Sequence, residues 1–233
     1  MILRWFIFSS LIATMPVCAA TLSGQVELAD SREASVSKQK DYSGIVVWLE
    51  PQTTSTRPVK PGNFTMVQKN KRFNPHVLVV PVGSNVDFPN SDPIFHNAFS
   101  NFSGQPFDTG LYPPGTSQKI RFRREGVVRV FCNIHSNMSA VIIVLNTPYF
   151  ARTEKDGTFK VNGLPPGEYR LKVWHERAAQ KTLDALQQKL VVNEDRALPV
   201  IRISESGYLE VPHKDKHGQE YPANDRSYTG APK

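Results

Sequence analysis

The chain has 233 residues, of which 39% are hydrophobic and 21% charged, so it is long enough to bury one large or two small hydrophobic cores. Its formal net charge is +7, and the basic residues are scattered along the sequence instead of clustering with aromatic residues. This distribution argues against nucleic acid as a partner. It fits either an anionic docking partner or a surface tuned for solubility.

Residues 1–20 have the pattern of a cleaved secretory signal peptide. Arg4 supplies the positive charge, residues 5–12 the apolar core, and residues 18–20 a small-residue cleavage site. The apolar core is too short for stable membrane insertion, and Pro16 interrupts the segment. The alternative of a lipid anchor on the cysteine of the cleavage site has only a poor lipobox before it. We therefore expect a periplasmic protein whose one remaining cysteine is Cys132.

The rest of the pattern indicates an all-β protein. Alternating or continuous apolar runs, punctuated by Gly, Pro and Asn, predict short strands of a sandwich or Greek-key barrel. In chain order, the runs cover residues 24–28, 45–49, 77–80, 86–88, 119–123, 128–132 and 140–145. The last run is apolar at every position, which is typical of a strand buried on both faces. The segment 100–117 has no clear periodicity and lies either near the 132–138 motif or over another face.

A Cys-x2-His-x2-Met motif begins at the end of the predicted strand 128–132 and consists of Cys132, His135 and Met138. His96 precedes them on a different predicted strand end. Two imidazoles, one thiolate and one thioether are the ligands of a mononuclear type 1 copper site, in which the methionine is a weak axial ligand. The alternatives are an inert buried thiol, an intermolecular disulfide or a cysteine nucleophile. No helix follows Cys132, and this disfavours a cysteine hydrolase.

The stretch from Phe88 to Ser100, together with Val130 to Met138, resembles the cupredoxin family, and the match covers residues 63–147. The nearest types are plastocyanin, amicyanin and the periplasmic methylamine-utilisation proteins. This resemblance implies a Greek-key sandwich with one copper bound by His96, Cys132, His135 and Met138. It also implies that Asn97 supports the Cys132 loop and that the ring edge of His135 is the port for electrons.

Residues 148–205 resemble the carboxypeptidase regulatory-like, transthyretin-like β-sandwich. Asp156-Gly157 is expected to form a turn, and residues 178–188 fit a helix and a polar loop equally well. Residues 21–62 form an N-terminal β segment whose pattern is similar. If it joins this second sandwich, the cupredoxin segment is an insertion. Residues 206–233 are expected to be a polar, disordered tail.

The remaining histidines favour structural roles. His175 and His76 are expected to be hydrogen-bonded structural residues. His213 and His217 lie in the predicted tail, where they could at most capture a loosely held metal.

The resulting hypothesis is a non-enzymatic carrier of single electrons. Its partners would be redox proteins, either haem proteins or dehydrogenases, with an acidic docking face. A second hypothesis is a non-redox protein that binds or delivers copper in the cell envelope. A third is a structural or adhesion module whose metal site is vestigial. Catalytic copper oxidases need further histidines, typically in His-x-His pairs, and the sequence has no such pair.

Overall fold

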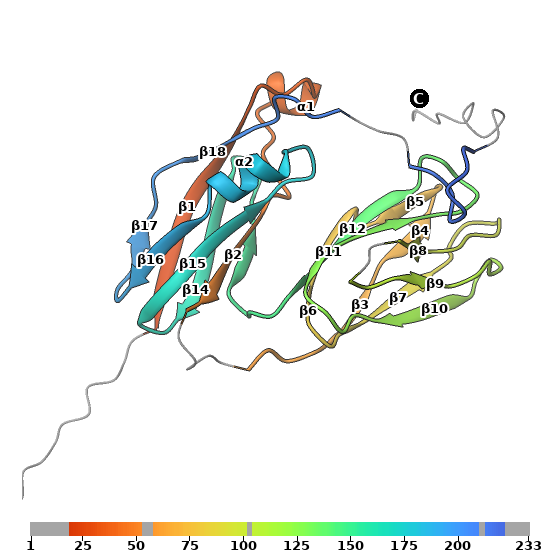
Figure 1. The fold of residues 1–233 in the computed structure, drawn as a ribbon, viewed down its shortest axis with the longest axis horizontal. Helices are drawn as coiled ribbons and strands as arrows, with labels where there is room; N and C mark the ends of the chain where they lie inside the picture. The colour runs from red at the N-terminus through yellow and green to blue at the C-terminus, as the bar shows by residue number, and fades with distance from the viewer. Residues whose placement is uncertain (1–18, 53–57, 102–103, 210–212, 222–233) are drawn as a thin grey trace, which may run out of the picture.

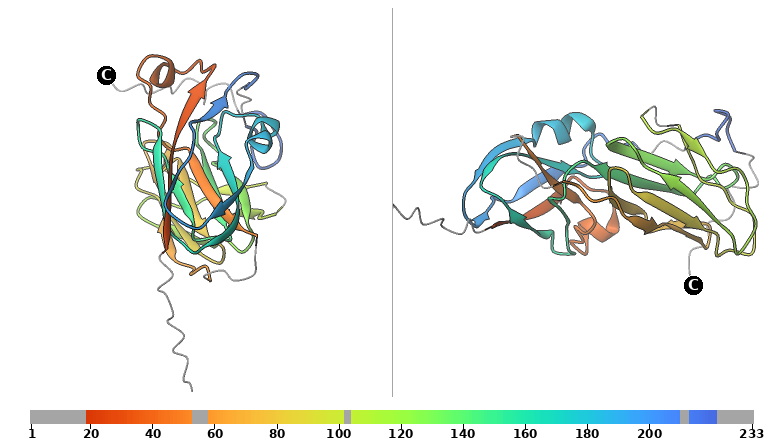
Figure 2. Two further views of the ribbon diagram at one scale, coloured as in Figure 1. Left: turned by 90° about the vertical axis from the view of Figure 1, so that its left-hand side faces the viewer. Right: turned by 90° about the horizontal axis from the view of Figure 1, so that it is seen from below.

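The structure is a computed structural model that describes residues 19–52, 58–101, 104–209 and 213–221. It is an all-β fold of two β-sandwiches that lie side by side (Figures 1 and 2). The predicted signal peptide lies outside the described residues, apart from Ala19 and Ala20, of which Ala20 is the first residue of β1. Within the described ranges, no helix is long and apolar enough to cross a membrane.

The central sandwich contains the metal-ligand candidates. Its two main sheets have the strand orders β10-β7-β3 and β6-β12-β11-β8-β9, and β4 and β5 form a separate hairpin. The strands are β3 (Asn63–Thr65), β4 (Val67–Lys69), β5 (Arg72–Asn74), β6 (Val77–Pro81), β7 (Asn85–Pro89), β8 (Phe99–Ser100), β9 (Phe107–Asp108), β10 (Ser117–Arg121), β11 (Gly126–Phe131) and β12 (Ser139–Leu145).

The flanking sandwich is built from both ends of the chain. One sheet is β13-β2-β15-β16, and in the other β1 pairs with β14, β17 and β18. Its elements are β1 (Ala20–Ala29), α1 (Ala34–Ser37), β2 (Val46–Pro51), β13 (Phe150–Arg152), β14 (Thr158–Leu164), β15 (Gly167–Trp174), α2 (Gln180–Ala185), β16 (Gln188–Val192), β17 (Arg196–Ala197) and β18 (Ile201–Ser204). The chain therefore leaves this sandwich after β2, forms the central sandwich, and returns at β13.

Strand β12 joins the two sandwiches because both of its faces are buried. Val141, Ile143 and Leu145 pack in the core of the flanking sandwich. Ala140 and Ile142 alternate with them and face the core of the central sandwich. A period of two sends successive side chains to opposite faces, so the uninterrupted apolar run supplies two cores at once.

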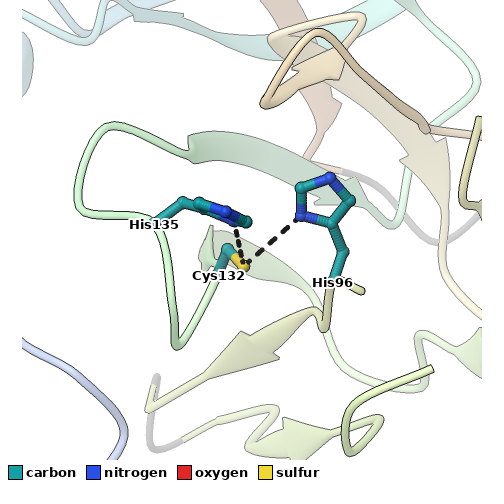
Figure 3. A group of neighbouring side chains, drawn as sticks. All are labelled: His96, Cys132 and His135. Atoms are coloured by element: carbon teal, nitrogen blue, oxygen red, sulfur yellow. Dashed lines mark hydrogen bonds between the residues drawn. The ribbon is translucent and has the colours of Figure 1, made fainter. Parts of the chain in front are cut away.

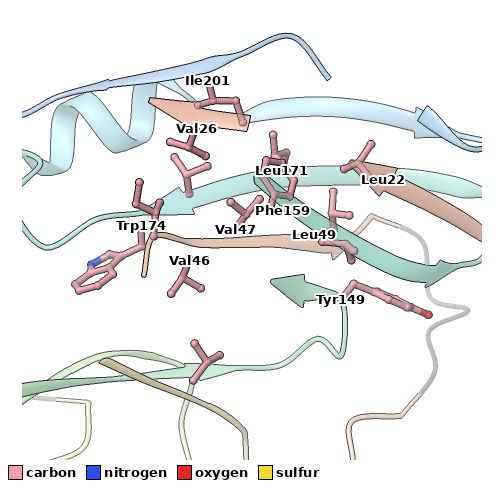
Figure 4. Close-up of a cluster of buried hydrophobic side chains, with 14 of the residues drawn as sticks. Leu22, Val26, Val46, Val47, Leu49, Tyr149, Phe159, Leu171, Trp174 and Ile201 are labelled. Carbon is pink, nitrogen blue, oxygen red and sulfur yellow. The ribbon is translucent and has the colours of Figure 1, made fainter. Parts of the chain in front are cut away.

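The flanking core explains the alternating pattern of its strands. The core contains Val47 and Leu49 of β2 beside Leu171 of β15, the neighbouring strand of the same sheet, as Figure 4 shows. At the predicted Asp156-Gly157 turn, Gly157 has a φ of +81° and leaves no space for a side chain, since a Cβ there would collide with the carbonyl oxygen of Val26. Glycine is required at this position by both its backbone angle and the close approach of β1.

Part of the expected tail is not disordered, and that prediction is wrong for residues 213–221. These residues lie against the central sandwich, where Tyr221 is buried and the His213 ring stacks on Phe131. The polar composition of the segment hid these aromatic contacts. Residues 210–212 and 222–233 lie outside the described ranges.

His175 and His76 both have structural partners. The Nε2 atom of His175 lies 2.7 Å from Oε1 of Glu205, which also accepts hydrogen bonds from Arg177, while Oε2 of Glu205 accepts one from Ser31. His76 lies 2.6 Å from Glu176 through its Nε2 atom. The guanidinium of Arg177 beside Glu205 leaves no cation site there, so this cluster is structural.

The His175 cluster predicts a loss of stability in mild acid. Burial lowers the pKa of His175 below its ordinary value, so the folded protein resists protonation at a pH where the unfolded chain accepts a proton. Stability is therefore complete above the unfolded pKa of about 6.5 and falls as the pH drops below it. We expect the thermal midpoint of the metal-free protein to fall from pH 7 to pH 5, and His175→Gln to reduce that fall. Each kcal/mol regained should raise the midpoint by roughly 2–4 °C.

A matched control is His76→Gln. The hydrogen bond to Glu176 raises the pKa of His76, so this histidine adds stability below its unfolded pKa and loses that contribution as the pH rises through the folded value. The control variant should therefore steepen the acid fall. Equal slopes for wild type and His175→Gln would contradict this interpretation.

Candidate metal centre

Cys132, His135 and Met138 lie in the loop between β11 and β12. The backbone closes this loop on itself: the amide of Cys132 donates to the carbonyl oxygen of Met138 at 3.1 Å, and the amide of Met138 donates to the carbonyl oxygen of His135 at 3.1 Å. Strand β11 points Val128 and Val130 into the central core, so Cys132, two residues further, faces the same way. The short loop then brings His135 back over the Cys132 sulfur.

His96 reaches the same point from the segment after β7. Its backbone forms a two-way bridge with Tyr112, with hydrogen bonds of 3.3 Å and 2.9 Å. Tyr112, in the segment 100–117, therefore lies beside the candidate site, next to His96. Tyr112 is itself fixed because its hydroxyl donates to the carbonyl oxygen of Phe88 at 2.8 Å and contacts the Gln68 amide.

The three side chains converge in the interior (Figure 3). The Nδ1 atoms of His135 and His96 lie 3.5 Å and 3.9 Å from the sulfur of Cys132. The ligand atoms of the three residues all lie within 4.8 Å of one another. Cys132 and His96 are inaccessible to solvent, and His135 is 8% exposed.

These distances fit a single ion bound by all three residues. Metal–sulfur and metal–nitrogen bonds of about 2.3 Å and 2.0–2.1 Å, arranged trigonally, would separate sulfur from nitrogen by about 3.8 Å. Both observed separations lie within about 0.3 Å of this value. The donor set, one thiolate and two imidazoles, suits copper.

Met138, the fourth predicted ligand, is completely buried in the same hydrophobic cluster as Cys132. Backbone hydrogen bonds connect Met138 to Cys132 and to His135, so the three residues are fixed as one unit. A thioether is the kind of weak, soft donor that type 1 copper takes as an axial ligand, so Met138 remains the predicted fourth ligand.

Asp92 contacts His96 at Nε2, the ring nitrogen that does not face Cys132. Its Oδ2 atom lies 2.8 Å from Nε2 of His96, and its two oxygens accept the backbone amides of Asn70 and Lys71 at 2.6 Å and 2.8 Å. Asn70 and Lys71 form the β4–β5 turn with φ values of 55° and 54°, a conformation that these hydrogen bonds support. Asp92 therefore ties the position of His96 to a tight turn on a neighbouring hairpin.

Burial and the contact with Asp92 together set the protonation state and the tautomer of His96. Burial lowers the pKa of His96 against the opposing effect of Asp92, so the imidazole is neutral at neutral pH. Burial alone would raise the pKa of Asp92, but hydrogen bonds from Lys71, His96 and Asn70 hold it below its ordinary value. With the Nε2 proton donated to the Asp92 carboxylate, the lone pair of His96 is on Nδ1, which faces Cys132.

Asn97 contacts the loop from the other side. Its Oδ1 atom accepts the backbone amide of Asn133, the residue after Cys132, at 2.6 Å. Its Nδ2 atom donates to Asp108 at 3.2 Å. The carboxamide therefore bridges the Cys132 loop and β9.

No protein-family model matches the chain, and no curated protein matches it. Solved structures match part of the chain, as three examples show. The Cu-containing nitrite reductase NirK from Thermus scotoductus SA-01 is 23% identical with a TM-score of 0.35, and the match covers 52% of this chain but only 28% of the reductase. A purple cupredoxin from Nitrosopumilus maritimus is 24% identical with a TM-score of 0.32, over 35% of this chain and 98% of that protein. A reduced Cu(I) form of amicyanin is 16% identical with a TM-score of 0.35, over 42% of this chain and 98% of amicyanin.

The structural neighbours are cupredoxins.

Three exposed large apolar side chains are next in sequence to buried residues at the cluster. Phe95, Leu111 and Ile134 are 52%, 56% and 36% exposed, and they are immediate sequence neighbours of His96, Tyr112 and His135. We call these three residues the apolar rim. The described residues include six exposed large apolar side chains, and half of them belong to this rim.

Sequence reasoning missed two groups of residues at this centre. Asp92 was overlooked, although an acidic residue four positions before a candidate histidine ligand was visible in the sequence. The contacts of Tyr221 and His213 were also missed, because these residues lie more than 80 positions after Cys132 and no local pattern connects them to it.

Proposed function

We propose that this chain is a periplasmic type 1 copper protein that carries single electrons between redox partners. The observation that carries the proposal is the buried convergence of His96, Cys132 and His135, with Met138 in the same cluster. Bound copper would supply a one-electron couple. Thiolate and imidazole donors with a weak axial thioether suit both oxidation states.

The surrounding protein restricts movement of the ligands, which is what rapid electron transfer needs. The imidazole of His96 is fixed at Nε2 by Asp92, and the Cys132 loop is fixed by its own backbone and by Asn97. Ligands that rest on several strands and on outer hydrogen bonds keep their geometry when the charge of the site changes.

Burial supports a carrier over an enzyme. Cys132 and His96 are inaccessible and His135 is nearly so, so an ion bound between these donors would be shielded from direct contact with a substrate. Electrons can cross a few ångströms of protein without direct contact between the metal and a partner. A signal-peptide pattern at residues 1–20 supports the periplasmic assignment.

Protein-film voltammetry of the copper-loaded protein tests the proposal. We expect a reversible one-electron wave whose oxidised and reduced forms interconvert without loss of metal. A protein that binds copper but gives no reversible wave, and that releases the copper readily to a chelator, would instead support the delivery function.

The apolar rim is the proposed docking surface for the redox partner. It includes Ile134, the residue before His135, and His135 is the most exposed of the candidate ligands, so contact there would bring a partner close to the metal. The net charge of +7 adds long-range attraction for a partner with an acidic face, such as a haem protein or a dehydrogenase.

Electron self-exchange between two copies of the protein tests this surface without knowledge of the partner. Ile134→Lys should lower the self-exchange rate constant about tenfold or more, because two rims that meet would bring like charges together. Line broadening in NMR spectra of mixed Cu(I) and Cu(II) samples measures this rate constant.

The matched control is Val191→Lys, which adds the same charge at an exposed apolar residue of the flanking sandwich. This variant should exchange electrons nearly as fast as wild type. If both substitutions slow self-exchange equally, the effect comes from net charge and the rim is not the docking surface.

A further inference from the structure

The C-terminal segment 213–221 lies against the outer side of the Cys132 loop, far from the flanking strand β18 that precedes it in the chain (Figures 1 and 2). In β11 and just after it, the side chains of Val130 and Cys132 point into the core, so Phe131 between them points outward. The segment covers this outward side. We call residues 213–221 the C-terminal clamp.

Tyr221 connects the clamp directly to a candidate ligand. Its hydroxyl donates to the backbone carbonyl oxygen of Cys132 at 2.6 Å, and the residue is 6% exposed. The amide of Cys132 donates a hydrogen bond to the Met138 carbonyl oxygen, so hydrogen bonds fix the peptide groups on both sides of the Cys132 Cα. Rotation of either group would move the sulfur.

His213 reinforces this contact through the residue before Cys132. Its ring stacks on Phe131 with a centroid separation of 4.4 Å and an interplanar angle of 27°. Its Nδ1 atom lies 3.1 Å from the Tyr221 hydroxyl and 3.3 Å from the carbonyl oxygen of Lys214. Since the Tyr221 proton is donated to Cys132, the Nδ1 proton of His213 is shared by two acceptors, the Tyr221 oxygen and the Lys214 carbonyl oxygen.

Lys216 joins the clamp to Asn97 through a closed ring of hydrogen bonds. The Lys216 amide donates to Oδ1 of Asn133 at 2.9 Å, and its ammonium group donates to Oδ2 of Asp108 at 2.7 Å. Asn97 completes the ring, because it accepts the Asn133 amide and donates to Asp108. The residue after Cys132 is thus held by its amide and by its side chain.

We propose that the C-terminal clamp is part of the metal centre, with Tyr221 as a positioning residue that fixes the Cys132 end of the ligand loop. His213 and Lys216 hold the clamp in place. The effect on bound copper rests on the proposed function, whereas the effect on the loop does not require the metal. Without the Tyr221 hydroxyl, the loop opens more often and the ion escapes more easily.

The test compares Tyr221→Phe with the matched control Tyr169→Phe. Tyr169 makes the same kind of hydrogen bond, from its hydroxyl to the carbonyl oxygen of Pro165 at 2.7 Å, but in the flanking sandwich. Amide hydrogen exchange of the metal-free protein is measured over residues 132–138. Loss of the Tyr221 hydroxyl should speed exchange there by about 3- to 10-fold, as expected for one hydrogen bond, and the control should leave it unchanged.

The second measurement is the rate at which the Cu(II)-loaded protein loses its metal to excess chelator. Tyr221→Phe should raise this rate by a similar factor, with Tyr169→Phe equal to wild type. Exchange in the 132–138 loop that matches wild type, or faster exchange with unchanged copper release, would overturn the proposal. If wild type shows no type 1 copper spectrum, the proposed function fails, and loop exchange in the metal-free protein alone decides whether the clamp exists.

Discussion

Replacing Cys132 by Ser should abolish the intense visible absorption of the copper-loaded protein and its reversible one-electron wave. The thiolate is the strongest soft donor in the cluster, and its sulfur lies within 3.9 Å of both histidine nitrogens. Changing an outer partner of a metal ligand already costs about 10–100-fold in affinity, so loss of the thiolate itself should cost at least about 100-fold in Cu(I) affinity. Competition with a chromophoric Cu(I) chelator measures this change.

Met138→Leu is the companion variant, because it keeps the thiolate and a similar buried volume. It should retain a charge-transfer band and shift the reduction potential upward, since a weak donor is replaced by none. Far-UV circular dichroism of both variants checks that they fold. A Cys132→Ser protein that kept an intense visible band would show that the colour does not come from this thiolate.

Asp92→Asn should raise the reduction potential and weaken Cu(II) binding. The Asp92 carboxylate lies 2.8 Å from Nε2 of His96 and places a negative charge next to the site. That charge stabilises the more positive Cu(II) and makes the imidazole a better donor. If a 10–100-fold loss of affinity falls on Cu(II), the potential rises by roughly 60–120 mV, at about 59 mV for each tenfold change in a one-electron couple. Voltammetry reports the shift.

The matched control is Asp87→Asn, which removes a carboxylate from β7 that pairs with Lys119 at 3.6 Å on the surface. Its charge is screened by solvent, so the potential should move little. Asp92→Asn also weakens the hydrogen bonds to the β4–β5 turn, and a shifted thermal midpoint would report that separate effect. Equal potentials for wild type and Asp92→Asn would contradict the role assigned to this carboxylate.

Much of the site was predictable because its residues have chemistry that is rare in combination. The spacing of Cys132, His135 and Met138 in a loop between two strands indicated one compact unit, and the structure contains a loop closed by backbone hydrogen bonds. His96 could be added to this unit because it follows another predicted strand, whose end was expected at the same end of the sandwich. Strand β12 was equally predictable from the sequence, since an apolar residue at every position indicates burial on both faces.

The features that could not be predicted depend on contacts between distant residues. A carboxylate such as Asp92 has the same sequence signature whether it faces water or a histidine, and only the fold places it behind His96. The C-terminal clamp was hidden in the same way: Lys, Asp, Gly and His in residues 213–221 suggest a solvated tail, and the partner of Tyr221 lies at the end of another strand.

The flanking sandwich supports the centre from a distance. Val79, Val141 and Ile143, from two strands of the central sandwich, belong to the flanking core. The sheet that ends in the Cys132 loop is therefore packed on both faces. This arrangement gives the ligand loop a rigid base, and it assigns a structural purpose to a region that contains no catalytic constellation among its described residues.

The most direct test of the central claim is the optical and EPR spectrum of the Cu(II)-loaded protein. We expect an intense thiolate-to-copper band in the visible region, together with the narrow copper hyperfine splitting of a type 1 site. A pale protein with an ordinary tetragonal Cu(II) signal would show that His96, Cys132, His135 and Met138 do not bind copper together, and it would contradict the proposed function.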